Sequence, residues 1–203
     1  MKSIKRIVLT GGPCAGKTSA LKILKEYFEN KGYSVFVEKE PATALISSGI
    51  NLENIKDYND FQRAVLSVHL FQEDLLTDYL ENKLITNENV LILYDRGIFD
   101  MKAYMPDDVF EMILNERGLS KQTLLNKYDA VFHLVTTANG AQTFYGKENN
   151  SARMEDLDLA KKLDEKTAGC WKSYKNFKII DNSTDFDGKM KRLIHAIEDV
   201  LNK

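Results

Sequence analysis

Cysteine is scarce in this chain, because Cys14 and Cys170 are the only two cysteines among its 203 residues. Two isolated cysteines supply neither a disulfide framework nor the paired spacing of a structural zinc site. The histidines His69, His133 and His195 also lack the spacing of metal ligands, and His133 interrupts an apolar run where a buried core imidazole is expected. The composition therefore indicates a reduced, cytoplasmic protein that folds around an apolar core.

Long apolar runs and an excess of basic residues are absent as well. The longest uninterrupted apolar stretch has about five residues, whereas a membrane-spanning helix needs about 20. The net charge is −2 and the pI is about 6.0, so no positive field favours nucleic acid as a partner. Residues 1–9 are basic and then apolar, but they run directly into the next motif. We interpret them as a core strand and not as a cleaved signal peptide.

What the chain does contain is a regular alternation of short apolar runs with amphipathic patterns of helical period. Strands are predicted at residues 5–10, 34–38, 90–94, 130–136 and 177–181. Helices are predicted at residues 17–31, 58–83, 107–126 (as a pair), 153–174 and 187–201. The long second helix is expected to gather on one side Phe61, Val65, Val68, Phe71 or Gln72, Leu75 and Tyr79. The alternation predicts one α/β domain over residues 1–203, with a five-stranded parallel sheet and helices on both faces.

The segment between the first strand and the first helix, GGPCAGKT, has the pattern G-x-x-x-x-G-K-[ST] of a phosphate-binding P-loop. Its glycines let the backbone N–H groups turn toward an anion, and the helix N-terminus adds positive charge. In this pattern Lys17 reaches the β- and γ-phosphates, and the Thr18 hydroxyl binds Mg²⁺. We therefore expect a three-layer P-loop NTPase fold that binds ATP or GTP with Mg²⁺. The predicted nucleotide-binding residues are Gly11, Gly12, Pro13, Cys14, Ala15, Gly16, Lys17, Thr18 and Ser19.

Two other interpretations of this segment are less consistent with its surroundings. A chance match within a turn would not require a strand before it and a helix after it. A Rossmann dinucleotide loop needs G-x-G-x-x-G, and Pro13 stands where the second glycine would be. The P-loop is the interpretation that accounts for the whole segment.

Ligands of parallel sheets bind at the carboxyl ends of the strands, so the residues after each strand are the next candidates. Asp95 follows the run 91–94 and has the position of a Walker B carboxylate that holds Mg²⁺. Its alternative role is to cap the next segment. Arg96 can bridge phosphoryl oxygens in a bidentate way, or it can simply pair with a nearby acid.

Two further candidates follow the second and fourth strands. Glu40 is predicted to be the general base toward an acceptor hydroxyl, the alternative being a solvated loop acid. Residues 137–156 are rich in Asn, Gly and Ser and are predicted to form a lid that delivers Arg153, with Lys147 a weaker candidate. The alternative is an ordinary long loop with a helix cap at Ser151.

One motif is expected to be a coincidence. Residues 126–129 read Asn-Lys-Tyr-Asp, which has the N-K-x-D pattern that recognises guanine in GTPases. In those proteins the motif follows a strand, whereas here it precedes the strand predicted at 130–136. It would then lie at the opposite end of the sheet from the P-loop, so we expect no recognition of guanine there.

Taken in order, several short segments resemble one P-loop group over nearly the whole chain. They are VLTGGPCAGKT, the Glu-Pro at 40–41, the Phe-Gln at 61–62, DRG-x-x-D-x-x-A-Y at 95–104, and YDAVFHL followed by the polar segment. The group is the AAA-like ATPase/kinase domain family, which includes the nicotinamide-riboside kinase domain of NadR-type proteins and the TRPL translocation defect protein. The resemblance implies a P-loop kinase or NTPase.

A more distant resemblance is to deoxyribonucleoside kinases, which share the Glu-Pro, the Phe-Gln and an acid-Arg pair at the same places. It implies that Glu40 is the catalytic base and that Asp95 and Arg96 serve the metal and the phosphoryl group. It further implies that Gln62 reads the acceptor's base, with Asp100 near another such position. This chain departs from that pattern with a glycine after the Arg and with Asp100 one residue closer, which bears on the identity of the acceptor.

The leading hypothesis is transfer of a phosphoryl group from ATP·Mg²⁺ to a small nucleoside-like or other hydroxyl acceptor, with Lys17, Arg96 and Arg153 stabilising the transferred group. The alternative is a regulatory switch that hydrolyses ATP or GTP slowly, since the resembled family also includes regulators that bind GTP and phosphoinositides. In a switch the lid and residues 41–60 would change order with the nucleotide. The sequence leaves open the acceptor, the choice of nucleotide and the oligomeric state.

Overall fold

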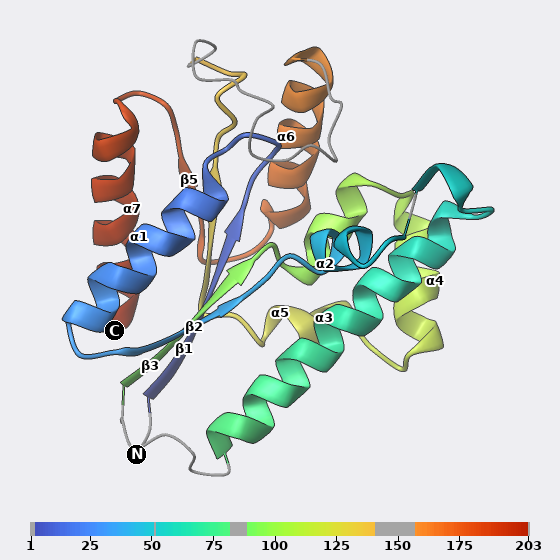
Figure 1. Cartoon of the computed structure of the whole chain (residues 1–203), viewed down its shortest axis with the longest axis horizontal. Coiled ribbons are helices and arrows are strands. Elements are labelled where there is room, and N and C mark those ends of the chain that lie inside the picture. The colour runs from blue at the N-terminus through green and yellow to red at the C-terminus, as the bar shows by residue number, and fades with distance from the viewer. Residues whose placement is uncertain (1–2, 51, 82–88, 141–156, 203) are drawn as a thin grey trace.

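The computed structural model describes residues 3–50, 52–81, 89–140 and 157–202. Within them, five parallel strands form one sheet in the order β2-β3-β1-β4-β5 (Figure 1). The strands are β1 (Ser3–Thr10), β2 (Ser34–Glu38), β3 (Asn89–Asp95), β4 (Ala130–Leu134) and β5 (Phe177–Ile180). The predicted five-stranded parallel sheet is therefore confirmed, with strand ends that differ from the prediction by no more than about two residues, the usual uncertainty of such boundaries.

Helices cover both faces of the sheet, as the alternation predicted (Figure 1). One apolar core lies between the sheet and helices α1 and α7, and the other lies between the sheet and α3, α4 and the neighbouring short helices. The helices are α1 (Lys17–Asn30), α2 (Pro41–Ser47), α3 (Tyr58–Glu81), α4 (Asp107–Glu116), α5 (Lys121–Leu125), α6 (Leu157–Trp171) and α7 (Phe186–Leu201), with 3₁₀ turns η1 (Leu52–Asn54) and η2 (Ile98–Ala103).

Burial on both faces explains why the central strands are almost continuously apolar. In β1, Ile7 and Leu9 pack in the core beside α1, whereas Val8 packs in the core beside α3. The same alternation holds along β3, in which every residue from 90 to 94 is buried. In the part of the chain that the structure describes, no helix is long and apolar enough to span a membrane.

The predicted apolar side of α3 is partly wrong. Phe61 and Val65 are buried, but Phe71, Leu75 and Tyr79 are exposed by 65%, 58% and 42%. The helix instead turns inward a second set of residues, which includes the polar side chains His69 and Glu73. Apolar residues on α3 cover more than one stripe, so their period alone did not identify the buried face. The inward residues of the helix's second half are Leu66, His69, Glu73 and Leu80.

Helix α2 was not predicted from the sequence. Pro41 occupies its first turn, where the fixed φ and the missing N–H of proline favour helix initiation. A short helix therefore begins at Pro41, soon after β2 ends at Glu38. This places Glu40 at the N-cap position, directly beside the carboxyl edge of the sheet.

Candidate active site

The strand order brings the two predicted phosphate-site segments to neighbouring strand ends. In the parallel register Leu9 of β1 lies opposite Asp95 of β3. The backbone N–H of Arg96 then donates to the Leu9 carbonyl at 3.0 Å, which extends the pairing by one step. The P-loop after β1 and the Asp95–Arg96 pair therefore leave the sheet side by side.

The loop after β1 has the unusual backbone that its glycines allow. Gly11 and Gly16 have positive φ angles of 146° and 84°, which side chains other than glycine rarely tolerate. A Cβ atom on Gly11 would lie 2.3 Å from the Leu134 carbonyl oxygen, so β4 approaches too closely for any larger residue. Lys17 is buried, and its ammonium donates to the carbonyl oxygens of Gly11 and Gly12 at 2.9 Å each. The ammonium thus lies against the first residues of the loop.

Arg96 is the central side chain of the site. It is only 6% exposed, its Nε donates to Glu40, and its Nη1 donates to the Gly11 carbonyl at 3.2 Å. Its Nη2 is buried and has no hydrogen-bond partner among the described residues. Burial works against its charge, yet the surrounding acidic groups raise the pKa of Arg96 above its ordinary value. Arg96 therefore connects the P-loop to Glu40, and its Nη2 is still able to donate hydrogen bonds.

Arg96 also has an unusual backbone conformation. Its φ of 74° lies in the left-handed region, which is uncommon for residues other than glycine. Such conformations cost about 1–3 kcal/mol and persist where the surroundings fix them. Here the pairing with Leu9 on one side and the Glu40 and Asp100 carboxylates on the other hold the residue in place.

Asp100 lies beside Arg96, and its carboxylate oxygens are engaged by hydrogen bonds within the protein. Its carboxylate accepts hydrogen bonds from the Thr10 hydroxyl at 2.7 and 2.8 Å and from the Trp171 indole N–H. It also lies 3.4 Å from Arg96 Nη1. These contacts make Asp100 an anchor for Arg96, and its predicted role in reading the acceptor stays a prediction.

A cavity of about 320 Å³ opens beside Arg96, and we call it the side pocket. It brings together four residues that the sequence assigned to the catalytic or acceptor site, although they come from three separate segments of the chain. Three aromatic side chains contribute to its mostly apolar wall and suit the flat ring of a ligand. The polar members are Glu40, Gln62, Arg96, Asp100 and His69, and the aromatic members are Tyr58, Phe61 and Tyr104.

Beneath the side pocket lies a buried acid pair, Glu38 and Glu73. His69 Nε2 lies 3.4 Å from Glu73 and 3.9 Å from Glu38, and Glu73 also pairs with Lys127. Burial and the nearby Glu73 charge raise the pKa of Glu38 to about 8. Burial alone would raise the pKa of Glu73 too, but His69 and Lys127 outweigh it and lower that pKa to about 2. The pair therefore holds one charged and one neutral carboxyl at neutral pH.

The neutral carboxyl gives a testable pH dependence of stability. Between its ordinary pKa of 4.5 and its folded pKa of about 8, Glu38 is protonated in the folded chain and ionised in the unfolded one. The native state then binds more protons, so the free energy of unfolding falls as the pH rises through this window. We expect Glu38→Gln to remove this fall and to stabilise the protein at pH 8 by on the order of 3 kcal/mol, with little change at pH 4.5.

Urea unfolding of both proteins from pH 4.5 to 8.5 measures the effect. The groups that face Glu38 are His69 and Glu73 on α3, Tyr94 on β3 and Lys127 after α5. Glu73 acts in a different window, because its stabilising charge is lost only as the pH falls from 4.5 toward 2. Parallel stability curves for the wild type and Glu38→Gln above pH 5 would contradict the assignment.

The two predicted metal ligands come from the start of α1 and from the end of β3. Thr18 is an exposed residue of the first turn of α1, and Asp95 is half-buried at the end of β3. A hydroxyl and a carboxylate are the oxygen donors that Mg²⁺ prefers. Among the described residues no cluster of three or more His, Cys, Asp or Glu side chains could hold a metal by itself. The donor set therefore fits Mg²⁺ that arrives with a polyphosphate, whose oxygens supply the remaining ligands.

Most of the predicted lid, including Arg153 and Lys147, lies outside the described residues. Its described beginning is tied to the P-loop, because the Thr137 N–H and hydroxyl both donate to the Cys14 carbonyl at 3.3 and 3.0 Å. The N-K-x-D segment precedes β4, as predicted, and there Lys127 pairs with Glu73 while Asp129 accepts from the Arg6 N–H. It lies at the amino end of the sheet.

Lys189 and Asp164 contact the P-loop segment and its surroundings but were not predicted from the sequence. Lys189 of α7 donates to the carbonyls of Val135 at 2.7 Å and Ala15 at 3.4 Å, and burial lowers its pKa to about 8. Asp164 of α6 accepts from the Gly12 N–H at 2.7 Å. The only sequence signal was a charged residue within the apolar face of each helix.

The sequence is similar to known proteins over most of its length. The sequence profile of the AAA domain family matches residues 6–189. The thymidylate kinase of Bacillus mycoides (strain KBAB4) is 25% identical over 205 residues, which are 96% of this chain and 95% of that protein. The thymidylate kinase of Thermoanaerobacter sp. (strain X514) is 24% identical over 208 residues, which are 97% and 98%.

These matches confirm the predicted P-loop kinase family, whereas the narrower likeness to NadR-type and TRPL proteins stays a prediction. The matched profile covers the P-loop, the Asp95–Arg96 exit and the described part of α6. The chain belongs to the AAA domain family of P-loop proteins.

Proposed function

We propose that this protein is a kinase that transfers the γ-phosphoryl group of ATP to a hydroxyl group of a nucleoside-like molecule in the side pocket. The observation that carries the proposal is the position of Arg96. Its guanidinium contacts the P-loop at the Gly11 carbonyl and the Glu40 carboxylate at the pocket, and it lines that pocket itself. A group that bridges donor and acceptor is what phosphoryl transfer requires.

On the donor side, the backbone of the P-loop and Lys17 would hold the phosphates. Thr18 and Asp95 would hold Mg²⁺, which supplies charge neutralisation at the phosphate oxygens when it is bound. The buried Lys17 ammonium lies 2.9 Å from two loop carbonyls, so it is held at the loop that would bind the phosphates. Arg153, in the segment beyond the described residues, would add a further positive charge.

On the acceptor side, Glu40 would accept the hydroxyl proton and Gln62 would read the edge of the ring. Glu40 is suited to this because its carboxylate is held by Arg96 and by the Thr43 hydroxyl at 2.6 Å, and it lines the side pocket. Gln62 is 4% exposed and lines the same pocket from α3. An amide in such a place discriminates by its hydrogen bonds.

A nucleoside monophosphate is a second candidate acceptor, because the relatives at 24–25% identity are thymidylate kinases. Its acceptor atom would be a phosphate oxygen, which needs no general base. Arg96 would then bind the acceptor's phosphate through its unpaired Nη2. The two acceptor classes therefore make opposite demands on Glu40.

The test is ADP formation with ATP·Mg²⁺ and a panel of nucleosides, ribosides and nucleoside monophosphates. For a hydroxyl acceptor, we expect Glu40→Gln to lower kcat by about 10²-fold, since a general base contributes at least that much. The affinity for ADP should be unchanged, and Glu26→Gln on the exposed face of α1 serves as the control.

Two other outcomes would contradict the proposed hydroxyl acceptor or the kinase activity itself. Acceptance of a monophosphate alone, with Glu40→Gln still active, would replace the hydroxyl acceptor by a phosphate. Turnover that is independent of every acceptor would contradict the kinase and favour the nucleotide-dependent switch.

A further inference from the structure

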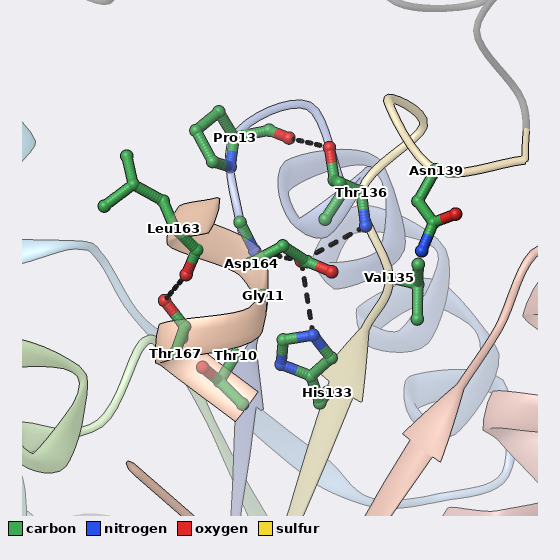
Figure 2. Close-up of polar contacts among 12 residues, drawn as sticks. Thr10, Gly11, Pro13, His133, Val135, Thr136, Asn139, Leu163, Asp164 and Thr167 are labelled. Carbon is green, nitrogen blue, oxygen red and sulfur yellow. Dashed lines mark hydrogen bonds and ion pairs between the residues drawn. The ribbon is translucent and has the colours of Figure 1, made fainter. Parts of the chain in front are cut away.

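Asp164 is a buried carboxylate that contacts the P-loop from a distant helix. It belongs to α6, is 5% exposed, and its Oδ1 accepts a hydrogen bond from the Gly12 N–H at 2.7 Å. The same oxygen accepts from the Thr136 N–H at 3.2 Å (Figure 2). One carboxylate oxygen therefore joins the loop after β1 to the chain leaving β4.

His133 completes the surroundings of this oxygen. Its Nε2 lies 3.2 Å from Asp164 Oδ1, and the ring is 1% exposed at the end of β4 (Figure 2). A carboxylate in such a place would be costly unless hydrogen bonds compensated it. Two backbone amides and an imidazole converge on it here, so Asp164 is satisfied by the groups that it holds together.

The contact with Gly12 is close as well as polar. A Cβ atom on Gly12 would lie 2.8 Å from the Asp164 Cβ atom, so only glycine allows this approach. The Gly12 carbonyl accepts from Lys17 at the same time. Both backbone polar groups of Gly12 are thus engaged by the protein. This places Gly12 among the residues that shape the loop, although the sequence suggested that it binds the nucleotide directly.

The loop has further supports on the same side. The Thr136 hydroxyl donates to the Pro13 carbonyl (Figure 2). The Thr137 hydroxyl donates to the Cys14 carbonyl at 3.0 Å. Thr136 is itself held by Asp164 through its N–H. The first half of the loop therefore rests on a polar support whose centre is Asp164, while α6 carries Leu163 of the side-pocket wall next to it.

We propose that Asp164 is a positioning residue for nucleotide binding, which holds the first half of the P-loop in the shape that grips a polyphosphate. This rests on the proposed nucleotide site. A loop with the Gly12 and Thr136 N–H groups left unpaired would sample other conformations. The free energy needed to return to the binding shape would then lower the affinity for every nucleotide. Because all three contacts converge on one accepting oxygen, an amide oxygen at the same place preserves them.

The experiment compares Asp164→Asn, which keeps the accepting oxygen, with Asp164→Ala, which removes it. We expect Asp164→Ala to weaken Mg²⁺·ADP binding at least about 10-fold and Asp164→Asn to stay within about threefold of the wild type. Isothermal titration of the folded proteins measures this, and Glu165→Ala, at the exposed next position on α6, is the control. If Asp164→Ala does not fold, Asp164→Ser replaces it. The serine side chain is polar, but its hydroxyl is too short to accept the hydrogen bonds from the loop.

Amide hydrogen exchange without nucleotide gives a readout that does not depend on the proposed function. Faster exchange in residues 11–18 of Asp164→Ala, with β3 unchanged, is expected. Wild-type affinity in folded Asp164→Ala, or equal losses in the Asn and Ala variants, would overturn the inference. A wild-type protein that binds no nucleotide would refute the nucleotide site, while the exchange measurement would still test whether Asp164 shapes the loop.

Discussion

Replacing Lys17 by Ala is expected to lower acceptor-dependent ADP formation by at least about 10³-fold. The Lys17 ammonium is buried and lies 2.9 Å from the carbonyls of Gly11 and Gly12, so the fold itself places it at the phosphate loop. Without this ammonium, the negative charge that develops on the transferred group in the transition state is less stabilised. The loss should appear in kcat more than in KM for the acceptor, because Lys17 does not line the side pocket.

The controls separate this loss from a loss of structure. Lys17→Ala also removes the side-chain donor of the buried Gly12 carbonyl, which costs about 1–3 kcal/mol of stability, whereas the Gly11 carbonyl keeps its hydrogen bond from Arg96. Lys17→Met fills more of the same volume, and it should be equally inactive while its unfolding midpoint stays closer to that of the wild type. Lys22→Ala, at an exposed position of the same helix, should keep full activity. Activity within tenfold of the wild type in Lys17→Met would remove Lys17 from the proposed mechanism.

The sheet and the P-loop could be predicted from sequence because each depends on local pattern. The run 90–94 is buried on both faces of the sheet, and such strands can be recognised in the sequence as continuous apolar runs. The glycines of the loop could be recognised because the positive φ angles at positions 11 and 16 strongly favour glycine. The strand order, which places Leu9 beside Asp95, is a long-range property, and only the general behaviour of parallel sheets made it a reasonable expectation.

What the sequence did not reveal depends on partners far along the chain. The carboxylate of Asp164 meets the Gly12 N–H across 152 positions of sequence. His69 and Glu73 lie on the inward side of α3 because Tyr128 and Lys127 supply polar partners there. A polar residue is expected on the outer face of a helix, so no periodicity signal predicts these contacts. Such exceptions mark places where the fold serves a site, and both clusters adjoin the proposed one.

Arg96→Lys is the second large effect, and its rationale is the geometry of a guanidinium. Arg96 reaches Glu40 through Nε, and Gly11 and Asp100 through Nη1, in separate directions. A lysine ammonium is a single point and cannot span them, although it keeps the charge. We expect kcat to fall by about 10³-fold, the lower range for an arginine that stabilises transferred phosphate. Nucleotide affinity should change little, because Lys17 and the loop remain.

A matched arginine outside the site is the control that tests whether the loss of activity is specific to Arg96. Arg63 also forms a two-point pair, with Glu116 at 2.8 and 2.9 Å, but it lies outside the side pocket. Arg63→Lys should therefore keep its activity. If Arg96 acts with Glu40 as one unit, the combined variant with Glu40→Gln should lose much less than the product of the two single losses. Independent, multiplying losses would mean that Arg96 serves the phosphates without Glu40, and the bridge between donor and acceptor would have to be another group.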